Sequence, residues 1–165
     1  MIWVNPRHNA EFILPNYQKP MPAIKNYTTQ ISTEKTLGEI QKALATHKAT
    51  AVLTEYDDGG VVTHVSFKLR MEHGEMSFRL PANIDGVLGC LLQNPTVPKR
   101  LRCREQAARV AWRIVKDWIE AQLAIVDAEM CEMAEVFLPY AQLTNDGRTL
   151  YEKFQDAPQA LLLEG

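Results

Sequence analysis

Residues 61–71 read VVTHVSFKLRM, a segment in which apolar and polar side chains alternate along the chain. Successive side chains of a β-strand point to opposite faces of a sheet, so this alternation predicts a strand with one buried face and one solvated face. The side chains expected on the buried face are Val61, Thr63, Val65, Phe67, Leu69 and Met71, and those expected on the solvated face are Val62, His64, Ser66, Lys68 and Arg70.

The neighbouring segments predict two more strands and a helix. Residues 50–56 (TAVLTEY) are rich in β-branched and apolar residues, and the DDGG sequence at 57–60 is typical of a hairpin turn. His73-Gly74 marks a second turn, after which apolar and polar residues alternate again through Leu80. Before these strands, an apolar repeat predicts a helix from about Thr33 to Thr46, capped by Ser32 or Thr33. The sequence thus predicts a three-stranded antiparallel meander covered by one helix.

The C-terminal half is expected to be helical. Asn83 can cap a short helix, a long helical stretch is predicted from about Arg104 to Val136, and residues 149–154 allow a final helix. The predicted fold class is therefore α+β: a helix plus a three-stranded antiparallel meander, followed by a helical C-terminal half with one long helix. Four prolines among the first 22 residues exclude a regular helix there. The expected organisation is an extended proline-rich arm (1–26), a single α+β domain (27–157) and a frayed tail (158–165).

The long helical stretch carries an apolar repeat with a seven-residue spacing. Unbroken, it would span about 50 Å, and helices with such a repeat pack in pairs along the apolar seam. The sequence therefore predicts that the stretch either bends back or meets a partner helix, and it favours a homo-oligomer. The residues assigned to this oligomer seam are Trp112, Ile119, Leu123, Val126, Met130 and Met133.

Basic residues are concentrated at the start of the long helix. Seven of the eighteen Lys and Arg residues lie between positions 99 and 116, although the formal net charge is −2. The helix dipole favours acidic residues at this end, so helix stability does not explain the cluster. Arginine side chains and helix N-terminal amides suit phosphate oxygens, which predicts a binding site for a phosphate-bearing ligand. The residues assigned to it are Arg100, Arg102, Arg104, Arg109, Arg113 and Lys116.

Two interpretations of this basic cluster remain open at the level of sequence. From Asp117 to Glu135 the charged residues are all acidic, so the basic residues could instead pair with carboxylates of the same chain or of another subunit. The solvated face of the meander also carries Lys68, Arg70 and Arg79. Sheet faces that bind single-stranded nucleic acid usually expose aromatic rings, whereas Phe67 and Phe78 alternate onto the buried face. We therefore expect that face to be an ordinary solvated surface.

The sequence lacks the motifs of several common enzyme classes. It contains no GxxxxGK[ST], GxGxxG, HExxH or GxSxG. The three cysteines, Cys90, Cys103 and Cys131, are widely spaced and predict free thiols in a reducing compartment. We therefore expect no catalytic residues, no metal, no cofactor and no enzymatic activity. No apolar run approaches the length of a membrane span and no secretory signal is evident, so we expect a cytoplasmic protein without a membrane partner.

Several stretches carry a resemblance to a known family. These are TEKT (33–36), FRLPAN (78–83), REQA (104–107), AWR (111–113) and VFLPY (136–140). Together they resemble a family of short uncharacterised proteins of bacteriophages and mobile elements, over roughly residues 27–155. The resemblance implies the cytoplasm of a bacterial host cell and a role in phage DNA metabolism, regulation or countering host defence. It brings no assigned catalytic or binding residues.

The functional prediction from sequence is a phage or mobile-element protein that acts without catalysis. It is expected to bind a phosphate-bearing ligand stoichiometrically, nucleic acid above all, through the basic helix start. The alternative is an anti-defence inhibitor that binds a host defence protein or sequesters a nucleotide signal.

Overall fold

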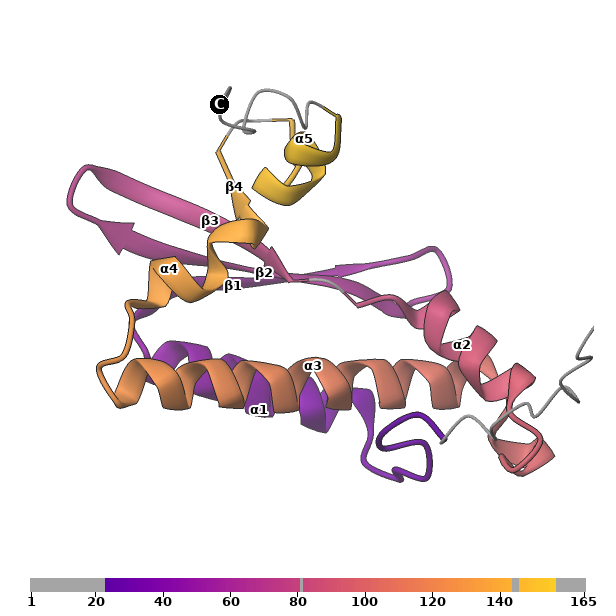
Figure 1. Ribbon diagram of the computed structural model, residues 1–165. Coiled ribbons are helices and arrows are strands. Elements are labelled where there is room, and N and C mark those ends of the chain that lie inside the picture. Colours follow the sequence, from indigo (N-terminus) through magenta and orange to yellow (C-terminus); the bar gives the residue numbers. More distant parts are fainter. Residues whose placement is uncertain (1–22, 81, 144–145, 157–165) are drawn as a thin grey trace, which may run out of the picture.

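A four-stranded antiparallel sheet lies against two helices that cover only one of its faces (Figure 1). The computed structural model describes residues 23–80, 82–143 and 146–156. The strands follow the chain in the order β1-β2-β3-β4. Their bounds are Ala49–Tyr56 (β1), Val62–Met71 (β2), Gly74–Leu80 (β3) and Ala141–Gln142 (β4). The predicted α+β fold class is confirmed, and the meander gains a short fourth strand from the C-terminal half.

Helices α1 (Thr33–Thr46) and α3 (Arg104–Asp127) lie side by side beneath the inner face of the sheet. Of the two predicted caps of α1, Ser32 and Thr33, the structure uses Ser32, whose hydroxyl accepts a hydrogen bond from the Lys35 amide at 3.2 Å. In Figure 1 the helix α5 lies on the opposite side of the sheet, near β4. The remaining elements are α2 (Ile84–Gln93), the short 3-10 helix η1 (Lys99–Leu101), α4 (Met133–Phe137), the 3-10 helix η2 (Leu138–Tyr140) and α5 (Leu150–Asp156).

Aromatic side chains form the centre of the core between the sheet and the helices. Phe67 on β2 and Phe78 on β3 face each other and stack with their ring centroids 5.0 Å apart. The edge of Phe137 packs against Phe67 at 5.3 Å. Trp112 of α3 is completely buried, and its indole Nε1–H donates to the backbone carbonyl of Val62 at 3.0 Å. This bond gives the buried indole nitrogen a partner and fixes α3 to the start of β2.

The predicted alternation fails at the first residues of β2. Glu55 pairs with His64 and Tyr56 pairs with Val62, so Thr63 is an extra residue on β2. Such a bulge shifts which side chains face inward. Val62 is consequently buried, although the alternation placed it on the solvated face. The Thr63 hydroxyl donates to the carbonyl of Glu55 at 3.4 Å, across the bulge.

The long helical stretch is shorter than the sequence predicted. Helix α3 ends at Asp127, Glu129 adopts a left-handed conformation with φ of 56°, and α4 begins at Met133. The chain thus turns back toward the sheet, which was one of the two outcomes that the sequence left open.

The predicted oligomer seam requires a correction. Trp112, Ile119 and Leu123 are buried in the core of their own chain. Met133 also packs against that core, Val126 is half-buried, and Met130 is exposed. A helix that covers a sheet has an apolar stripe much like that of a coiled coil, so the repeat alone could not distinguish the two.

Residues 23–31, which include the end of the predicted arm (1–26), pack onto α3 of the same chain. The side-chain amide of Gln106, which is buried, donates to the carbonyls of Tyr27 and Thr29, both at 2.9 Å. Asp117 accepts a hydrogen bond from Asn26 at 2.9 Å and forms an ion pair with Lys25 at 2.8 Å. The rest of the predicted arm (1–22) and the predicted tail (158–165) lie outside the described residues. Among the described helices, none combines the length and the apolar character needed to cross a membrane.

We expect Trp112→Phe to destabilise the fold by about 2–4 kcal/mol, because it removes the bond to Val62 and leaves a cavity beneath the sheet. Chemical denaturation measures this change. The control is Tyr151→Phe, since Tyr151 is exposed and its substitution is expected to alter stability by less than about 0.5 kcal/mol. Equal stability of the two variants would contradict the central position of Trp112.

Candidate ligand-binding groove on the open face of the sheet

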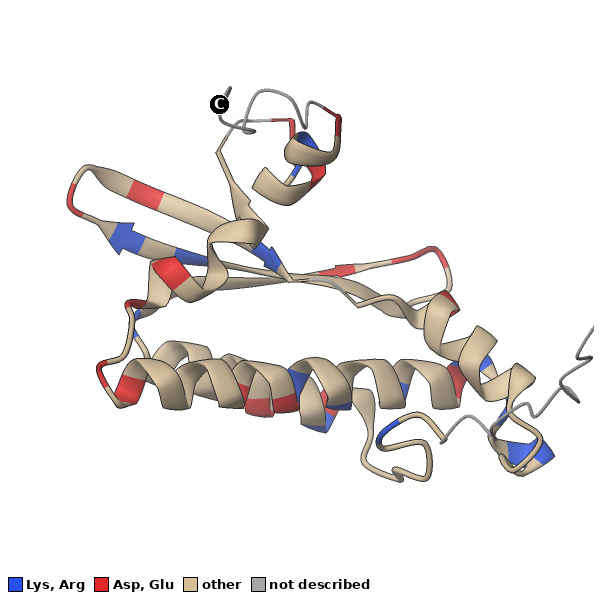
Figure 2. Ribbon diagram, viewed as in Figure 1, with Lys and Arg blue, Asp and Glu red and all other residues tan. Residues whose placement is uncertain are grey.

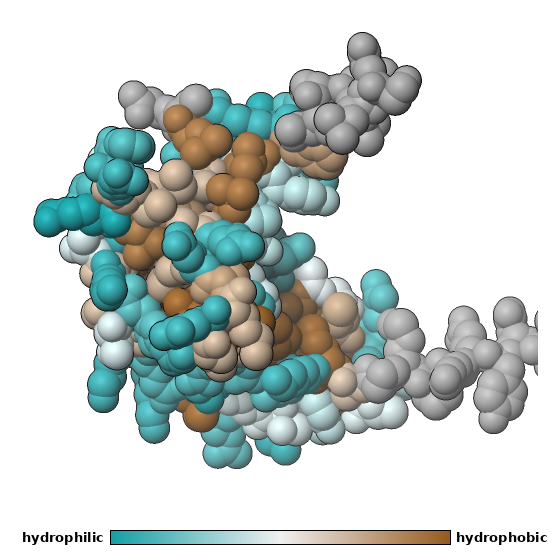
Figure 3. Space-filling model, turned by 60° about the vertical axis from the view of Figure 1, so that its left-hand side comes forward, coloured by the Kyte–Doolittle hydropathy of each residue, from teal (hydrophilic) through white to brown (hydrophobic). Residues whose placement is uncertain are grey.

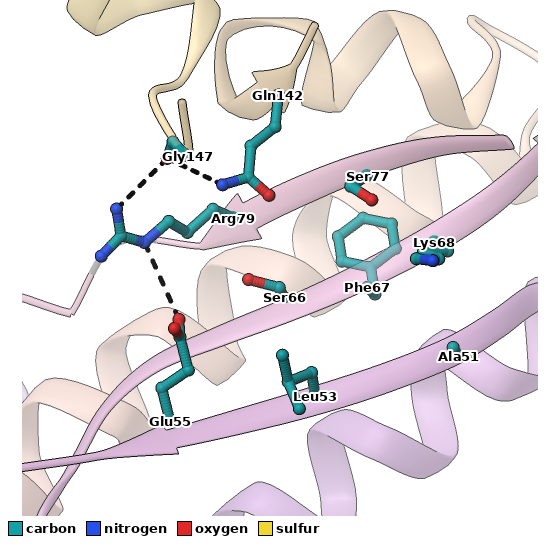
Figure 4. A pocket seen from close by; sticks show the side chains of 10 residues that line it. All are labelled: Ala51, Leu53, Glu55, Ser66, Phe67, Lys68, Ser77, Arg79, Gln142 and Gly147. Carbon is teal, nitrogen blue, oxygen red and sulfur yellow. Dashed lines mark hydrogen bonds and ion pairs between the residues drawn. The ribbon is translucent and has the colours of Figure 1, made fainter. Parts of the chain in front are cut away.

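The outer face of the sheet, opposite α1 and α3, carries a groove of about 260 Å³ (Figure 4). All four strands contribute to it, because every second residue of each strand points outward. Figure 3 shows that the surface is hollowed beneath the part of the molecule that carries α5. We call this site the outer-face groove. Its lining residues are Ala51, Leu53, Glu55, Ser66, Phe67, Lys68, Ser77, Arg79, Gln142 and Gly147.

Arg79 on β3 is the best-anchored cation of the groove. Its Nη2 donates to Nε2 of His64 at 2.8 Å, and its Nη1 donates to the carbonyl of Gly147 at 3.4 Å. Gln142 donates to the same carbonyl at 2.8 Å (Figure 4). The guanidinium group is therefore held at two of its nitrogens by neutral acceptors.

The third nitrogen of Arg79 lacks a hydrogen-bond partner. Its Nε is buried, and the nearest carboxylate oxygen, on Glu55, is 3.9 Å away, which is too long for a hydrogen bond. Nearly all buried donors in folded proteins are satisfied, so an unsatisfied one calls for a physical reason. The acceptor next to it is the Glu55 carboxylate, and a slight shift of this group would satisfy the N–H, whereas a ligand in the groove does not reach a donor without exposed surface.

His64 is the neutral partner that orients Arg79. A guanidinium group can only donate, so Nε2 of His64 is the acceptor and the ring proton lies on Nδ1, 3.1 Å from the hydroxyl of Thr63. Burial lowers the pKa of His64 from its ordinary value, and the charge of Arg79 lowers it further, while Glu55 acts in the opposite direction. The imidazole is thus kept neutral, which keeps its Nε2 lone pair free for Arg79.

The groove offers groups suited to an anionic ligand with an apolar part. Lys68 lies opposite Ser77 and Arg79 lies opposite Ser66 in the β2–β3 register, so two cations and two hydroxyls alternate across the strands. Two carboxylates form long ion pairs with these cations. Glu75 is 3.9 Å from Lys68, and Glu55 is 3.9 Å from Arg79. Leu53, which is 61% exposed, adds an apolar surface on β1.

Most of the basic residues that the sequence assigned to a ligand are paired with carboxylates of the same chain. Arg104 bridges Asp85 and Asp57, the latter at 3.3 Å. Arg109 pairs with Glu105 one turn earlier on α3. These pairs support the second interpretation of the basic cluster, that its charges are balanced by carboxylates of the same chain.

Arg113 and Lys116 continue this pattern along α3. Arg113 pairs with Glu39 of α1 at 2.6 Å. Lys116 lies 3.8 Å from the same carboxylate and pairs with Glu120 at 2.6 Å. Both side chains are 15% exposed, so these pairs join α1 to α3 at a largely buried contact.

Arg100 and Arg102 differ from the other four predicted residues. Arg102 donates to the carbonyls of Val97 at 2.9 Å and Pro95 at 3.2 Å, and Arg100 is exposed at the η1 tip, which is blue in Figure 2. Within the described ranges, neither has a carboxylate at ion-pair distance. The structure therefore splits the six predicted residues into four paired ones and two that keep an unbalanced charge.

Sequence reasoning placed Lys68 and Arg79 on one face but interpreted that face as simply solvated. It missed the wall formed by Gln142 and Gly147, because β4 is only two residues long and has no alternation of its own. The signal that could have indicated a binding site is the position of Arg79 in the hairpin, where it lies directly opposite Ser66 and diagonal to Lys68.

The pKa of His64 leads to a pH-dependent stability. Because the pKa is lowered in the folded state, the unfolded chain binds this proton first, and stability is lost as the pH falls below about 6.5. His64→Gln keeps an acceptor for Arg79 and cannot be protonated in this range. We expect thermal melts to show a smaller loss of stability between pH 7.5 and 5 for this variant than for the wild type.

The control for this prediction is His73→Gln, at the exposed turn between β2 and β3. It is expected to keep the pH dependence of the wild type. An identical pH dependence in His64→Gln and the wild type would show that His64 does not titrate as the geometry requires.

The ion pair between Arg113 and Glu39 should contribute to stability. We expect Arg113→Met to lower the free energy of unfolding by about 1–2 kcal/mol, because the carboxylate loses a half-buried partner. Arg100→Met, at the exposed η1 tip, should change it by less than about 0.5 kcal/mol. Urea denaturation of both variants measures the difference. Equal effects would contradict the conclusion that Arg113 forms a structural ion pair whereas Arg100 does not.

Comparisons with known proteins identify no family for this chain. No protein-family model matches the sequence, and neither the curated proteins nor the solved structures include a match. Within the described residues, no three His, Cys, Asp or Glu side chains are grouped so that they could hold a metal ion. The proposal of a function therefore depends on the geometry of the outer-face groove.

Proposed function

We propose that the protein binds a phosphate-bearing ligand stoichiometrically in the outer-face groove, and that this ligand is single-stranded nucleic acid. The observation that carries the proposal is the pair of cations that line the groove, Arg79 and Lys68, each with only a long contact to a carboxylate. The proposal keeps the ligand class expected from the sequence and moves the binding surface from the helix start to the sheet.

A phosphate group fits the donors of the groove. Arginine and lysine bind phosphate oxygens through charge-assisted hydrogen bonds, which are stronger than those between neutral groups. Arg79 is already oriented by His64 and Gly147, so little side-chain entropy would be lost when a ligand binds. The hydroxyls of Ser66 and Ser77 add donors beside the two cations.

The shape of the site favours a strand of nucleic acid. Both core helices lie on the other face, so a chain can lie across several strands of the open sheet (Figure 1). Single strands bind such faces through phosphate contacts together with apolar contacts to the bases. The described residues of the groove present no exposed aromatic ring, and the exposed Leu53 supplies the apolar contact instead. We therefore expect weaker base stacking and a stronger dependence on phosphate contacts than in aromatic sheet faces.

A free nucleotide is a second candidate ligand. The groove volume of about 260 Å³ is small, close to the lower limit for small-molecule sites, and it suits one nucleotide unit. This candidate corresponds to sequestration of a nucleotide signal. If the ligand is a free nucleotide, a mononucleotide should compete for the groove as effectively as an oligonucleotide. If the ligand is single-stranded nucleic acid, the oligonucleotide should compete better.

The test is a fluorescence-anisotropy titration of labelled single-stranded DNA, RNA and duplex DNA at low and high salt. We expect single strands to bind at low salt and to weaken steeply as salt rises, because phosphate contacts release counterions. Arg79→Gln and Lys68→Gln should each weaken binding at least about tenfold. Unlabelled mononucleotides added as competitors distinguish the two candidate ligands.

The matched control is the double variant Arg100→Gln/Arg102→Gln, which removes the two unbalanced charges near η1. Circular dichroism melts verify that each variant folds, and Lys68, being exposed, is the safer substitution. Unchanged binding in the control supports the outer-face groove. Loss of binding only in the control would return the site to the helix start, and absence of binding at low salt would refute both surfaces.

A further inference from the structure

Strand β1 forms an open edge of the sheet. It pairs with β2 on one side, and on the other side the described residues contribute no strand. Its sequence, ATAVLTEY, contains neither Pro nor Lys, and five of its eight residues are exposed. Its register with β2 is regular from Ala51 to Glu55, with shifts only toward the two ends. The strand therefore lacks the Pro and Lys that often protect a sheet edge, and its regular middle stretch is open to pairing.

The edge presents both hydrogen-bonding groups and apolar side chains to solvent. Backbone N–H and C=O groups on the outer side of an edge strand are available to another strand. Leu53 is 61% exposed and Tyr56 is 63% exposed, although both are large and partly apolar. A surface of this kind gains stability when a second strand covers it.

We propose that two copies of the chain pair antiparallel through β1, with a two-fold axis at Leu53. The two sheets then form one continuous sheet with the α1–α3 layers on the same side. This inference concerns the edge of the sheet and does not depend on the proposed ligand. It replaces the oligomer seam on α3 with a different surface.

Side-chain alternation selects the registers that are allowed. Residues that face each other in an antiparallel pair share one face of the sheet. Val52 packs against the core, so it must lie opposite another inward-facing residue. With the axis at Leu53, Val52 lies opposite Thr54 of the second copy. Thr54 is two positions from Val52 in the sequence, so it faces the same side of the sheet and the condition is met. A shift of one residue would place core-facing side chains against outward-facing ones.

Charge and apolar contact favour the axis at Leu53 and favour a second copy as the partner. The two Leu53 side chains meet at the axis and cover each other. Glu55, which carries the one charge within β1, lies opposite Ala51 instead of another glutamate.

The first experiment measures the molar mass of the full chain in solution by light scattering after gel filtration. We expect a dimer for the wild type at about 100 µM and a monomer for Leu53→Lys, which places two like charges at the axis and should weaken association at least about 100-fold. Leu92→Lys, on the exposed face of α2, is the matched control and should remain dimeric. A monomeric wild type, or a dimeric Leu53→Lys, overturns the proposal.

The second experiment tests the register in a chain whose three cysteines, Cys90, Cys103 and Cys131, are replaced by serine. With the axis at Leu53, the two Cα atoms at this position lie about 4.5–5.5 Å apart, so Leu53→Cys should form an intermolecular disulfide under mild oxidation. Ala51→Cys is the control, because its two copies would be about 13 Å apart. Faster cross-linking at position 51 than at position 53 overturns the proposed register.

Discussion

The contact on which the rest of the structure depends is the burial of Trp112 beneath the sheet, with its indole N–H bonded to the carbonyl of Val62. This contact holds α3 against the inner face, where the stacked rings of Phe67 and Phe78 complete the core. Helix α1 lies beside α3, and the ion pair between Arg113 and Glu39 joins the two. Because α1 and α3 both cover the inner face, neither of them obstructs the groove on the outer face.

The same arrangement divides the basic residues into two groups. Along α3, carboxylates of the same chain balance Arg104, Arg109, Arg113 and Lys116, so their charges stabilise the fold. On the outer face, Arg79 is held by the neutral groups of His64 and Gly147, and its Nε–H stays unsatisfied. Arg79 has only a long ion pair with Glu55, at 3.9 Å, so it is better prepared to bind an anion than a cation in a close ion pair. This difference supports the proposal that the ligand binds on the sheet.

The sequence predicted the parts of the fold that local patterns determine. Alternation predicted β2 and β3, the β-branched and apolar composition of residues 50–56 predicted β1, and the caps at Ser32 or Thr33 predicted the start of α1, so that the fold class followed. Features set by distant contacts escaped prediction: the bulge at Thr63 that turns Val62 inward, the two-residue strand β4, and the turn near Glu129 that ends α3. The basic cluster was visible in the sequence, as was the i,i+4 spacing that pairs Arg109 and Lys116 with glutamates of the same helix. The partners Asp57, Asp85 and Glu39 come from other elements, so those pairs could be recognised only in three dimensions.

The central claim, that the outer face of the sheet binds the ligand, is tested most directly by NMR of the ¹⁵N-labelled protein. Amide and arginine Nε–H signals are followed while single-stranded DNA is added at low salt. The account predicts that the Nε–H signal of Arg79 shifts, together with amides of residues 51–55, 64–68, 77–79 and 142, while residues 99–104 are unaffected. Shifts confined to residues 99–116, with the Arg79 signal unchanged, would contradict it.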